Sequence, residues 1–323
     1  MPDLQQLLFR SGLALAGLST RQRLSILIYH RVLPQQDDMR GAEPTAVDFE
    51  WQMKLLSRYF NVLPLQEAVS LLRSGKLPPR AACVTFDDGF ADNATVALPI
   101  LKRYGIPATV FVASGYLDGG RIWNDTVIEA LRLYREPVLD LTEVGLPVLD
   151  TVDQIHRRKA AYAIIRQAKY LDEIRRDEIA DYIAAMVGPL PDDLMLTADQ
   201  RRLLHCEGIE IGGHTVSHPI LAQLPLGVAR EQILKGKTQL EALLGAPVRV
   251  FAYPNGGRGK DYNNEHVSLV EEAGFEAAVA TDWGVADSAS DRYQLPRFTP
   301  WDKSEFRFLL RMAWNMHRTG RNR

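Results

Sequence analysis

The feature that most limits how this chain can fold is a repeated alternation of short apolar runs with longer segments of helical period. Seven runs, rich in β-branched and other apolar residues, each lead into a turn: residues 25–29, 82–86, 108–112, 209–213, 248–252, 276–281 and 295–298. Helical patterns lie between them, at residues 49–59, 93–104, 228–244 and 264–273. Apolar strands that alternate with helices are typical of an α/β protein with a parallel sheet covered by helices. About seven such units favour a distorted (β/α)7-type barrel, although an open sheet gives the same pattern.

One region interrupts this alternation. Residues 124–205 are charged and mainly helical in period, as at 155–167 and 171–186. We interpret them as a helical insertion in a barrel that spans residues 25–302, and we expect the insertion to wall one side of the cleft. Residues 1–24 are interpreted as an N-terminal helical segment, and residues 303–323 as a C-terminal helix with a basic tail.

Bulk composition excludes several classes of protein. A formal net charge of -2 gives no general reason to expect nucleic-acid binding, and two cysteines make neither a disulfide framework nor a zinc ribbon. The mildly apolar residues 7–18 lack the basic start of a signal peptide, and no run reaches the roughly 18 to 20 apolar residues of a spanning helix. We therefore expect a cytoplasmic protein without stable membrane insertion, for which peripheral association with the inner face of the membrane stays open.

The strongest local signal is a pair of acids at the end of an apolar run. Asp87, Asp88 and Gly89 directly follow the run at 82–86. Ligands and catalytic groups gather at the C-terminal ends of parallel strands, and neighbouring side chains there point in different directions. The two acids can therefore have different tasks. Taken alone, the motif is more often a turn with solvated carboxylates.

Two histidines follow another apolar run. His214 and His218 come directly after residues 209–213, and if the segment turns helically both imidazoles lie on one face. With Asp88 they would give two nitrogens and a carboxylate around one ion, leaving open positions of the kind that activate water. This ligand set suits zinc, and also cobalt, nickel or iron. A structural pair of histidines is the alternative.

A third motif, residues 251–257, contains Pro254, Asn255 and two glycines. Proline fixes the backbone and glycine permits close approach, so such a loop can aim a main-chain N–H at a developing oxyanion.

Together these motifs resemble the polysaccharide deacetylase (NodB-homology) family of carbohydrate esterases. The resemblance rests on T-F-D-D-G at 85–89 and H-T-V-S-H at 214–218. It extends to I-Y-H-R-V at 28–32, G-I-P-A-T-V-F-V at 105–112 and F-A-Y-P-N-G at 251–256, as in members from exopolysaccharide biosynthesis. The resemblance implies a distorted barrel of about seven units. It also implies that Asp87 is the general base, that Asp88, His214 and His218 bind a divalent metal, and that the Tyr253 backbone N–H helps to hold the oxyanion.

The sequence departs from the family pattern at two places. The arginine that pairs with the base in many members is replaced near Ala252, and Arg297, at a late strand, is the candidate substitute. The Leu-x-His that supplies the general acid is absent, which leaves His266 and His30 as candidates to protonate the leaving amine. His266 can equally be a helix-surface histidine, and His30 can equally form a hydrogen bond within the barrel. For the sugar subsite, the candidates are Pro254, Asn255, Trp283 and His30.

These features predict a metal-dependent hydrolase that removes N-acetyl groups from an N-acetylated glycan or from its oligosaccharide or lipid-linked precursor. One alternative is a deformylase or another C–N amide hydrolase of the same fold that acts on a non-polymeric substrate. A second alternative, from another class, is an inactive glycan-binding homologue.

Overall fold

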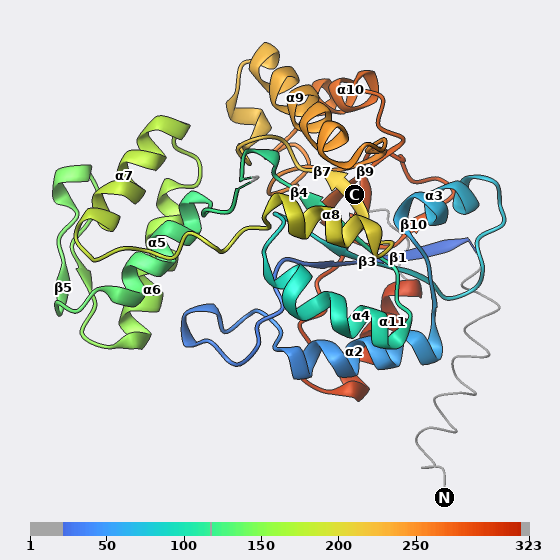
Figure 1. The fold of residues 1–323 in the computed structure, drawn as a ribbon, viewed down its shortest axis with the longest axis horizontal. Helices are drawn as coiled ribbons and strands as arrows, with labels where there is room; N and C mark the ends of the chain where they lie inside the picture. The colour runs from blue at the N-terminus through green and yellow to red at the C-terminus, as the bar shows by residue number, and fades with distance from the viewer. Residues whose placement is uncertain (1–21, 117, 318–323) are drawn as a thin grey trace, which may run out of the picture.

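The computed structural model describes residues 22–116 and 118–317 (Figure 1). The predicted N-terminal helical segment therefore lies outside the described residues up to position 21, and residues 23 and 24 belong to the first strand. The basic tail from position 318 onward lies outside them as well.

Seven parallel strands form the predicted barrel. In spatial order they are β1 (Arg23–Tyr29), β3 (Ala81–Phe86), β4 (Ala108–Val112), β7 (Glu210–Gly213), β8 (Val250–Ala252), β9 (Ala277–Trp283) and β11 (Leu295–Arg297). β2 (Asn61–Val62) pairs in parallel with β3, and β10 (Ala286–Asp287) pairs antiparallel with β1. Phe298, just after β11, closes the ring, because its N–H donates to Ile26 O and its carbonyl accepts from Ile28 N–H, both at 3.0 Å. The prediction of a barrel is confirmed.

Helices cover the outside of this barrel (Figure 1). The predicted helical segments are present as α2 (Ala46–Tyr59), η2 (Asn93–Ala97) with α4 (Leu98–Tyr104), α9 (Leu226–Leu244) and α10 (Asn264–Glu272). α3 (Leu65–Arg73) and the C-terminal helix α11 (Glu305–His317) complete the cover, and α11 contacts α2 and β1. α9 ends at Gly245, whose φ of +64° gives the left-handed cap that glycine adopts without a steric penalty.

The insertion forms a helical lobe beside the barrel (Figure 1). It contains α5 (Trp123–Leu133), α6 (Gln154–Ala168), α7 (Glu173–Ala185) and the small hairpin of β5 (Val138–Leu139) and β6 (Leu149–Asp150), and it has its own apolar core. Its two connections to the barrel run side by side, with bridges from Asp118 to Thr197 and from Gly120 to Asp193. The predicted end at residue 205 is wrong, because α8 (Ala198–Cys206) packs on α9 and β7 as part of the barrel.

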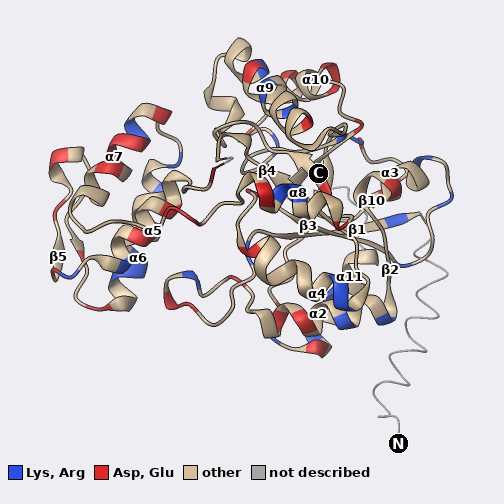
Figure 2. Ribbon diagram, viewed as in Figure 1, with Lys and Arg blue, Asp and Glu red and all other residues tan. Residues whose placement is uncertain are grey.

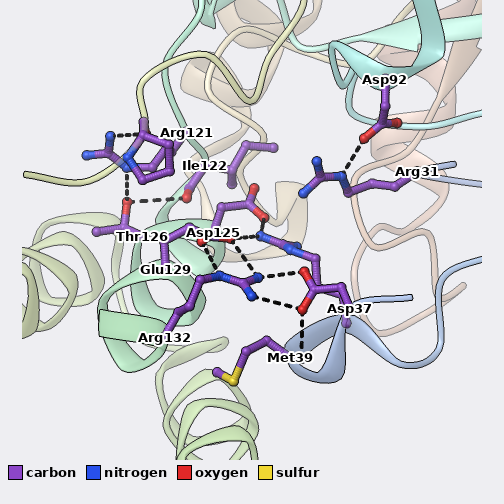
Figure 3. Close-up of polar contacts among 12 residues, drawn as sticks. Arg31, Asp37, Met39, Asp92, Arg121, Ile122, Asp125, Thr126, Glu129 and Arg132 are labelled. Atoms are coloured by element: carbon purple, nitrogen blue, oxygen red, sulfur yellow. Dashed lines mark hydrogen bonds and ion pairs between the residues drawn. The ribbon is translucent and has the colours of Figure 1, made fainter. Parts of the chain in front are cut away.

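Buried and half-buried ion pairs fix the lobe to the barrel (Figure 3). Arg40, in the 3-10 turn η1 (Asp38–Arg40) that follows β1, donates to Asp125 at 2.7 Å and to Glu129 at 3.0 Å on α5. Arg132 of the same helix donates two hydrogen bonds, of 2.9 and 2.6 Å, to Asp37. Ion pairs of this kind hold the lobe in one orientation relative to the barrel. A movement that separates one partner from the other would leave a charge uncompensated.

Charge over the rest of the molecule is mixed. Acidic and basic residues are interspersed along the helices in the view of Figure 2, in line with the formal net charge of -2. Within residues 22–116 and 118–317, no helix is both long enough and apolar enough to cross a membrane.

Candidate active site

The two acids lie at the C-terminal end of β3 and diverge there. The N–H of Asp87 donates to Tyr29 O at 2.9 Å and so continues the ladder between β3 and β1. Asp88 has a φ of +70° and Gly89 a φ of +83°. A left-handed aspartate costs of order 1 to 2 kcal/mol, a cost that folded proteins tolerate mainly at functional sites. Both carboxylates are buried, and the turn at Asp88 directs them to different partners.

The two histidines approach Asp88 from the loop after β7. Nε2 of His214 lies 3.3 Å, and Nε2 of His218 3.2 Å, from Asp88 Oδ1. The segment is not helical as the spacing argument assumed; Thr215 and His218 adopt φ values of +66° and +60°, and these tight bends bring the imidazoles together. The side chain of Gln232 on α9 holds the loop by accepting from the N–H groups of Val216 and Ser217.

These three side chains fit a metal ion. One ligand atom from each of Asp88, His214 and His218 lies within 4.8 Å of the other two. Nδ1 of His214 is 2.7 Å from Ala252 O, a contact that assigns the proton to Nδ1 and leaves Nε2 with a free lone pair. Asp88 Oδ1 is buried and has no hydrogen-bond partner among the described residues, as expected for an oxygen that serves as a metal ligand. Burial raises the pKa of Asp88, but the neighbouring imidazoles outweigh burial and hold that pKa well below its usual range.

Asp87 is paired with Arg297, as the sequence indicated. The guanidinium of Arg297 donates to both carboxylate oxygens, at 2.7 and 2.6 Å, and its Nε donates to Ala280 O at 2.8 Å. Both residues are buried. Burial raises the pKa of Asp87, and the charge and hydrogen bonds of Arg297 reverse that effect and lower the pKa below its ordinary value. Asp87 is therefore held ionised and in one orientation.

A cavity of about 330 Å³ joins these groups. Asp87, Asp88, His214 and His218 line its barrel side. The insertion lines the other side, as expected. Its contribution comes from residues of α5 and α6: Asn124, Asp125, Ile128, Tyr162 and Ile165.

Two further predicted residues, His30 and Asn255, line the same cavity. His30 follows β1; burial lowers its pKa, but the carboxylates of Asp88, Asp87 and Glu43 outweigh burial and raise it. Asn255 has a φ of +61°, and within the described part of the chain its backbone N–H has no acceptor. That N–H is therefore available to a ligand in the cavity.

Three predicted site residues, Tyr253, Pro254 and Trp283, are not among the residues that line this cavity. The N–H of Tyr253 donates to Val279 O at 3.3 Å within the sheet, and its ring stacks on Tyr262 with centroids 3.8 Å apart. Pro254 is buried and does not line the cavity. Trp283 packs against Phe298 and Trp301 instead of contacting the cavity.

His266 is also not at the site. It is the third residue of α10, and its ring forms part of the N-terminal capping box: Nδ1 lies 3.2 Å from Asn263 N and 2.7 Å from Asn263 Oδ1. The absence of His266 from the cavity leaves His30 as the histidine that can face a leaving group.

We expect the change His266→Ala to lower stability and spare activity. Loss of a helix cap typically costs about 1 kcal/mol, and the buried ring adds packing to that loss. Chemical denaturation should therefore show a lower free energy of unfolding while kcat for acetate release stays within about twofold of the unchanged protein. A fall of kcat with unchanged stability would return His266 to the catalytic candidates.

Residues that the sequence did not single out complete the cavity. Arg31, Arg40 and Glu43 follow β1 and line it together with Asp125 of the insertion. Arg31 is held by Asp92 at 2.7 Å (Figure 3). The position of Arg31 next to His30 is a sequence signal that could have identified it. Arg40, Glu43 and Asp125 have no local pattern that distinguishes them from surface charges.

A parallel barrel that gathers an Asp-His-His set and a second carboxylate at its strand ends has the architecture of a metal-dependent hydrolase. The profile of the polysaccharide deacetylase family matches residues 74–278, and the chain belongs to this family. Members of the family act on glycans and depend on a divalent metal, for which this chain retains the Asp-His-His set.

Known proteins agree with that assignment. YxkH of Bacillus subtilis strain 168, a candidate polysaccharide deacetylase, is 22% identical over 277 residues, which are 85% of this chain and 70% of YxkH. The poly-β-1,6-N-acetyl-D-glucosamine N-deacetylase of Staphylococcus aureus strain N315 is 39% identical over 86 residues, which are 26% of this chain and 30% of that enzyme.

Solved structures share the fold. The deacetylase PplD of Streptococcus pyogenes superposes with a TM-score of 0.61 at 21% identity, covering 90% of this chain and 98% of PplD. IcaB of Ammonifex degensii gives a TM-score of 0.58 at 21% identity, covering 91% of this chain and 97% of IcaB.

Proposed function

We propose that this chain is a metal-dependent carbohydrate N-deacetylase that hydrolyses the amide of an N-acetylated glycan or of its oligosaccharide or lipid-linked precursor. One observation carries the proposal: Asp88, His214 and His218 converge on one point beside the Arg297-bound carboxylate of Asp87. Membership of the polysaccharide deacetylase family and the similarity to a poly-N-acetylglucosamine N-deacetylase support it.

In this proposal Asp88, His214 and His218 hold the metal. Two imidazoles and a carboxylate suit zinc best, with cobalt, nickel and iron as further possibilities. A divalent ion in such a site acts as a Lewis acid toward water and toward the acyl carbonyl.

The chain's own groups supply the remaining chemistry. Asp87 accepts the proton of the attacking water; each of its oxygens keeps a lone pair beyond the bond to Arg297. The free N–H of Asn255, in place of the predicted Tyr253, donates to the oxyanion. His30, whose pKa is raised, carries the proton that the leaving amine requires.

The test is release of acetate. The full chain is incubated with Zn²⁺ or Co²⁺ and with β-1,4- and β-1,6-linked N-acetylglucosamine oligomers, and free acetate is measured. We expect release that a chelator stops and added metal restores. Formate from N-formylated sugars without any acetate would favour the deformylase alternative, and oligomer binding without any acyl release would favour a binding protein.

Metal binding has its own expected result. Added Zn²⁺ should raise the melting temperature of the chelator-treated protein, because a ligand at about 100 times its Kd stabilises the folded state by about 2.7 kcal/mol. In His214→Ala this increase should be largely lost. His205→Ala, which removes an exposed histidine on α8, is the matched control and should keep it. An equal increase in both variants would remove His214 from the ligand set.

The cytoplasmic location expected from the sequence stays a prediction, and we propose it together with a precursor glycan as substrate. Fractionation of cells that express the full chain would test it.

A further inference from the structure

The insertion contacts the barrel at a second place, which the reaction proposed above does not use. Beyond the end of α6, the hydroxyl of Tyr170 donates to Asp261 Oδ1 at 3.2 Å. Asp261 lies in the β8 loop, residues 253–263 between β8 and α10, and is only 4% exposed. The ammonium of Lys260, in the same loop, lies 4.7 Å from the centroid of the Tyr170 ring. This contact therefore joins the insertion to the loop that carries Asn255.

Asp261 holds the β8 loop from within. Its Oδ2 accepts the N–H of Gly257 at 2.9 Å, and its own N–H donates to Gly257 O at 2.8 Å. On the side of the sheet, the Thr281 hydroxyl donates to Asn255 O at 2.8 Å. Asn255 has the left-handed φ of +61°, which a residue other than glycine keeps only where its surroundings determine it. The direction of the free Asn255 N–H therefore depends on the bonds that hold the loop on both sides.

The Tyr170 contact and the ion pairs of Arg40 lie on different sides of the cavity. The ion pairs join α5 to η1 after β1, whereas Tyr170 joins the end of α6 to the loop after β8. Two strands, β9 and β11, separate β8 from β1 on the shorter way round the barrel. Tyr162 and Ile165 of α6 line the cavity, and Tyr170 follows the end of that helix. A shift of α6 over the cavity therefore acts on the β8 loop through Tyr170.

We propose that Tyr170 and Asp261 are positioning residues: the insertion, through the Tyr170 hydroxyl, holds the β8 loop so that the Asn255 N–H faces the cavity. The inference rests on the proposed function, in which that N–H donates to the oxyanion, and it gives the insertion a part in the chemical step. Neither Tyr170 nor Asp261 lines the cavity, so both act through the loop. Their effect falls on kcat rather than on KM, because the oxyanion forms in the transition state and is absent from the bound substrate.

The experiment removes the hydroxyl of Tyr170 and keeps its ring. In Tyr170→Phe of the metal-loaded full chain, kcat for acetate release from an N-acetylglucosamine oligomer should fall roughly three- to tenfold with little change in KM. This fall is smaller than the ~10²- to 10³-fold loss typical when an oxyanion donor is removed, because the donor stays and only its support is weakened. Tyr182→Phe is the matched control. It removes a hydroxyl that donates to Glu143 at 2.9 Å within the insertion, and it should leave kcat unaltered.

A second variant tests whether Tyr170 acts through Asp261. Asp261→Asn keeps the shape of the side chain but replaces one acceptor oxygen with a donor, so kcat should fall as well. The double variant Tyr170→Phe/Asp261→Asn should then be no slower than Asp261→Asn alone, because both changes break the same chain of contacts. Losses that multiply in the double variant would overturn this order of action.

Amide hydrogen exchange supplies a readout that needs neither metal nor turnover. In the metal-free protein the N–H of Gly257 should exchange roughly three- to tenfold faster in Tyr170→Phe than in the unchanged protein or in Tyr182→Phe, because its bond to Asp261 opens more often. An unchanged exchange rate, an unchanged kcat or a loss that lies in KM alone would overturn the proposal. If the unchanged protein releases no acetate but exchange at Gly257 is faster in Tyr170→Phe, the proposed function fails and the contact still positions the loop. If neither is observed, both fail.

Discussion

Exchange of Asp87 for asparagine is expected to lower kcat for acetate release about 10²- to 10⁴-fold, the range that a positioned general base contributes. Asparagine keeps the size of the side chain and can still accept from Arg297, but it cannot take a proton from water. The loss should therefore fall on kcat more than on KM, since nothing that binds the sugar is removed. Kinetics on a single N-acetylated oligomer in saturating metal measure both constants.

Two controls separate loss of the base from general damage. The Zn²⁺-induced increase in melting temperature should persist in Asp87→Asn, because Asp87 is not among the residues assigned as ligands. Asp199→Asn makes the same chemical change on the surface of α8, where the carboxylate pairs with Arg202, and should leave kcat unaltered. Full activity in Asp87→Asn would mean that another group takes the proton from water.

The sequence predicted this site well where short segments determine the structure. The apolar run that becomes β3 is followed directly by two acids and a glycine, so its position in the sequence places Asp87 and Asp88 at the strand end. The same holds for α9, whose end at Gly245 follows from a glycine at the position of the left-handed cap. Strand positions and helix caps of this kind depend mainly on the residues within the segment itself. The seven predicted strands are present for this reason.

Predictions that depended on distant partners were less secure. The N–H of Tyr253 donates to the carbonyl of Val279 on the neighbouring strand. The local sequence does not show which N–H groups form hydrogen bonds within the sheet. His266 has the side chain of a general acid, but Asn263 places it in a helix cap. The end of the insertion was misplaced because α8 has the same charged, helical character as the lobe and is distinguished only by its contacts with α9 and β7.

Replacement of Arg297 by methionine should cost both stability and activity. The arginine is fully buried and is the cation that balances the buried carboxylate of Asp87. Removing one partner of a buried ion pair typically destabilises a protein by about 3 to 5 kcal/mol, because the other charge is left uncompensated. Urea denaturation of the metal-free protein at pH 7 should show a loss of that size, and acetate release should fall because Asp87 is no longer oriented.

The pH dependence of this loss tests its electrostatic origin. In the unchanged protein the pKa of Asp87 is lowered below 3.8, so the stabilisation is present above about pH 4 and disappears as the pH falls through the folded-state pKa. In Arg297→Met the arginine no longer offsets burial, so the pKa of Asp87 rises. As the pH falls, Asp87 becomes protonated and the variant no longer bears the cost of an unpaired buried charge. The difference in free energy of unfolding should therefore be greatest at neutral pH and shrink toward pH 4. The double variant Asp87→Asn/Arg297→Met, which removes both charges of this pair, should recover part of the loss at pH 7. A difference that is independent of pH and unrelieved in the double variant would show that Arg297 acts by packing rather than by charge.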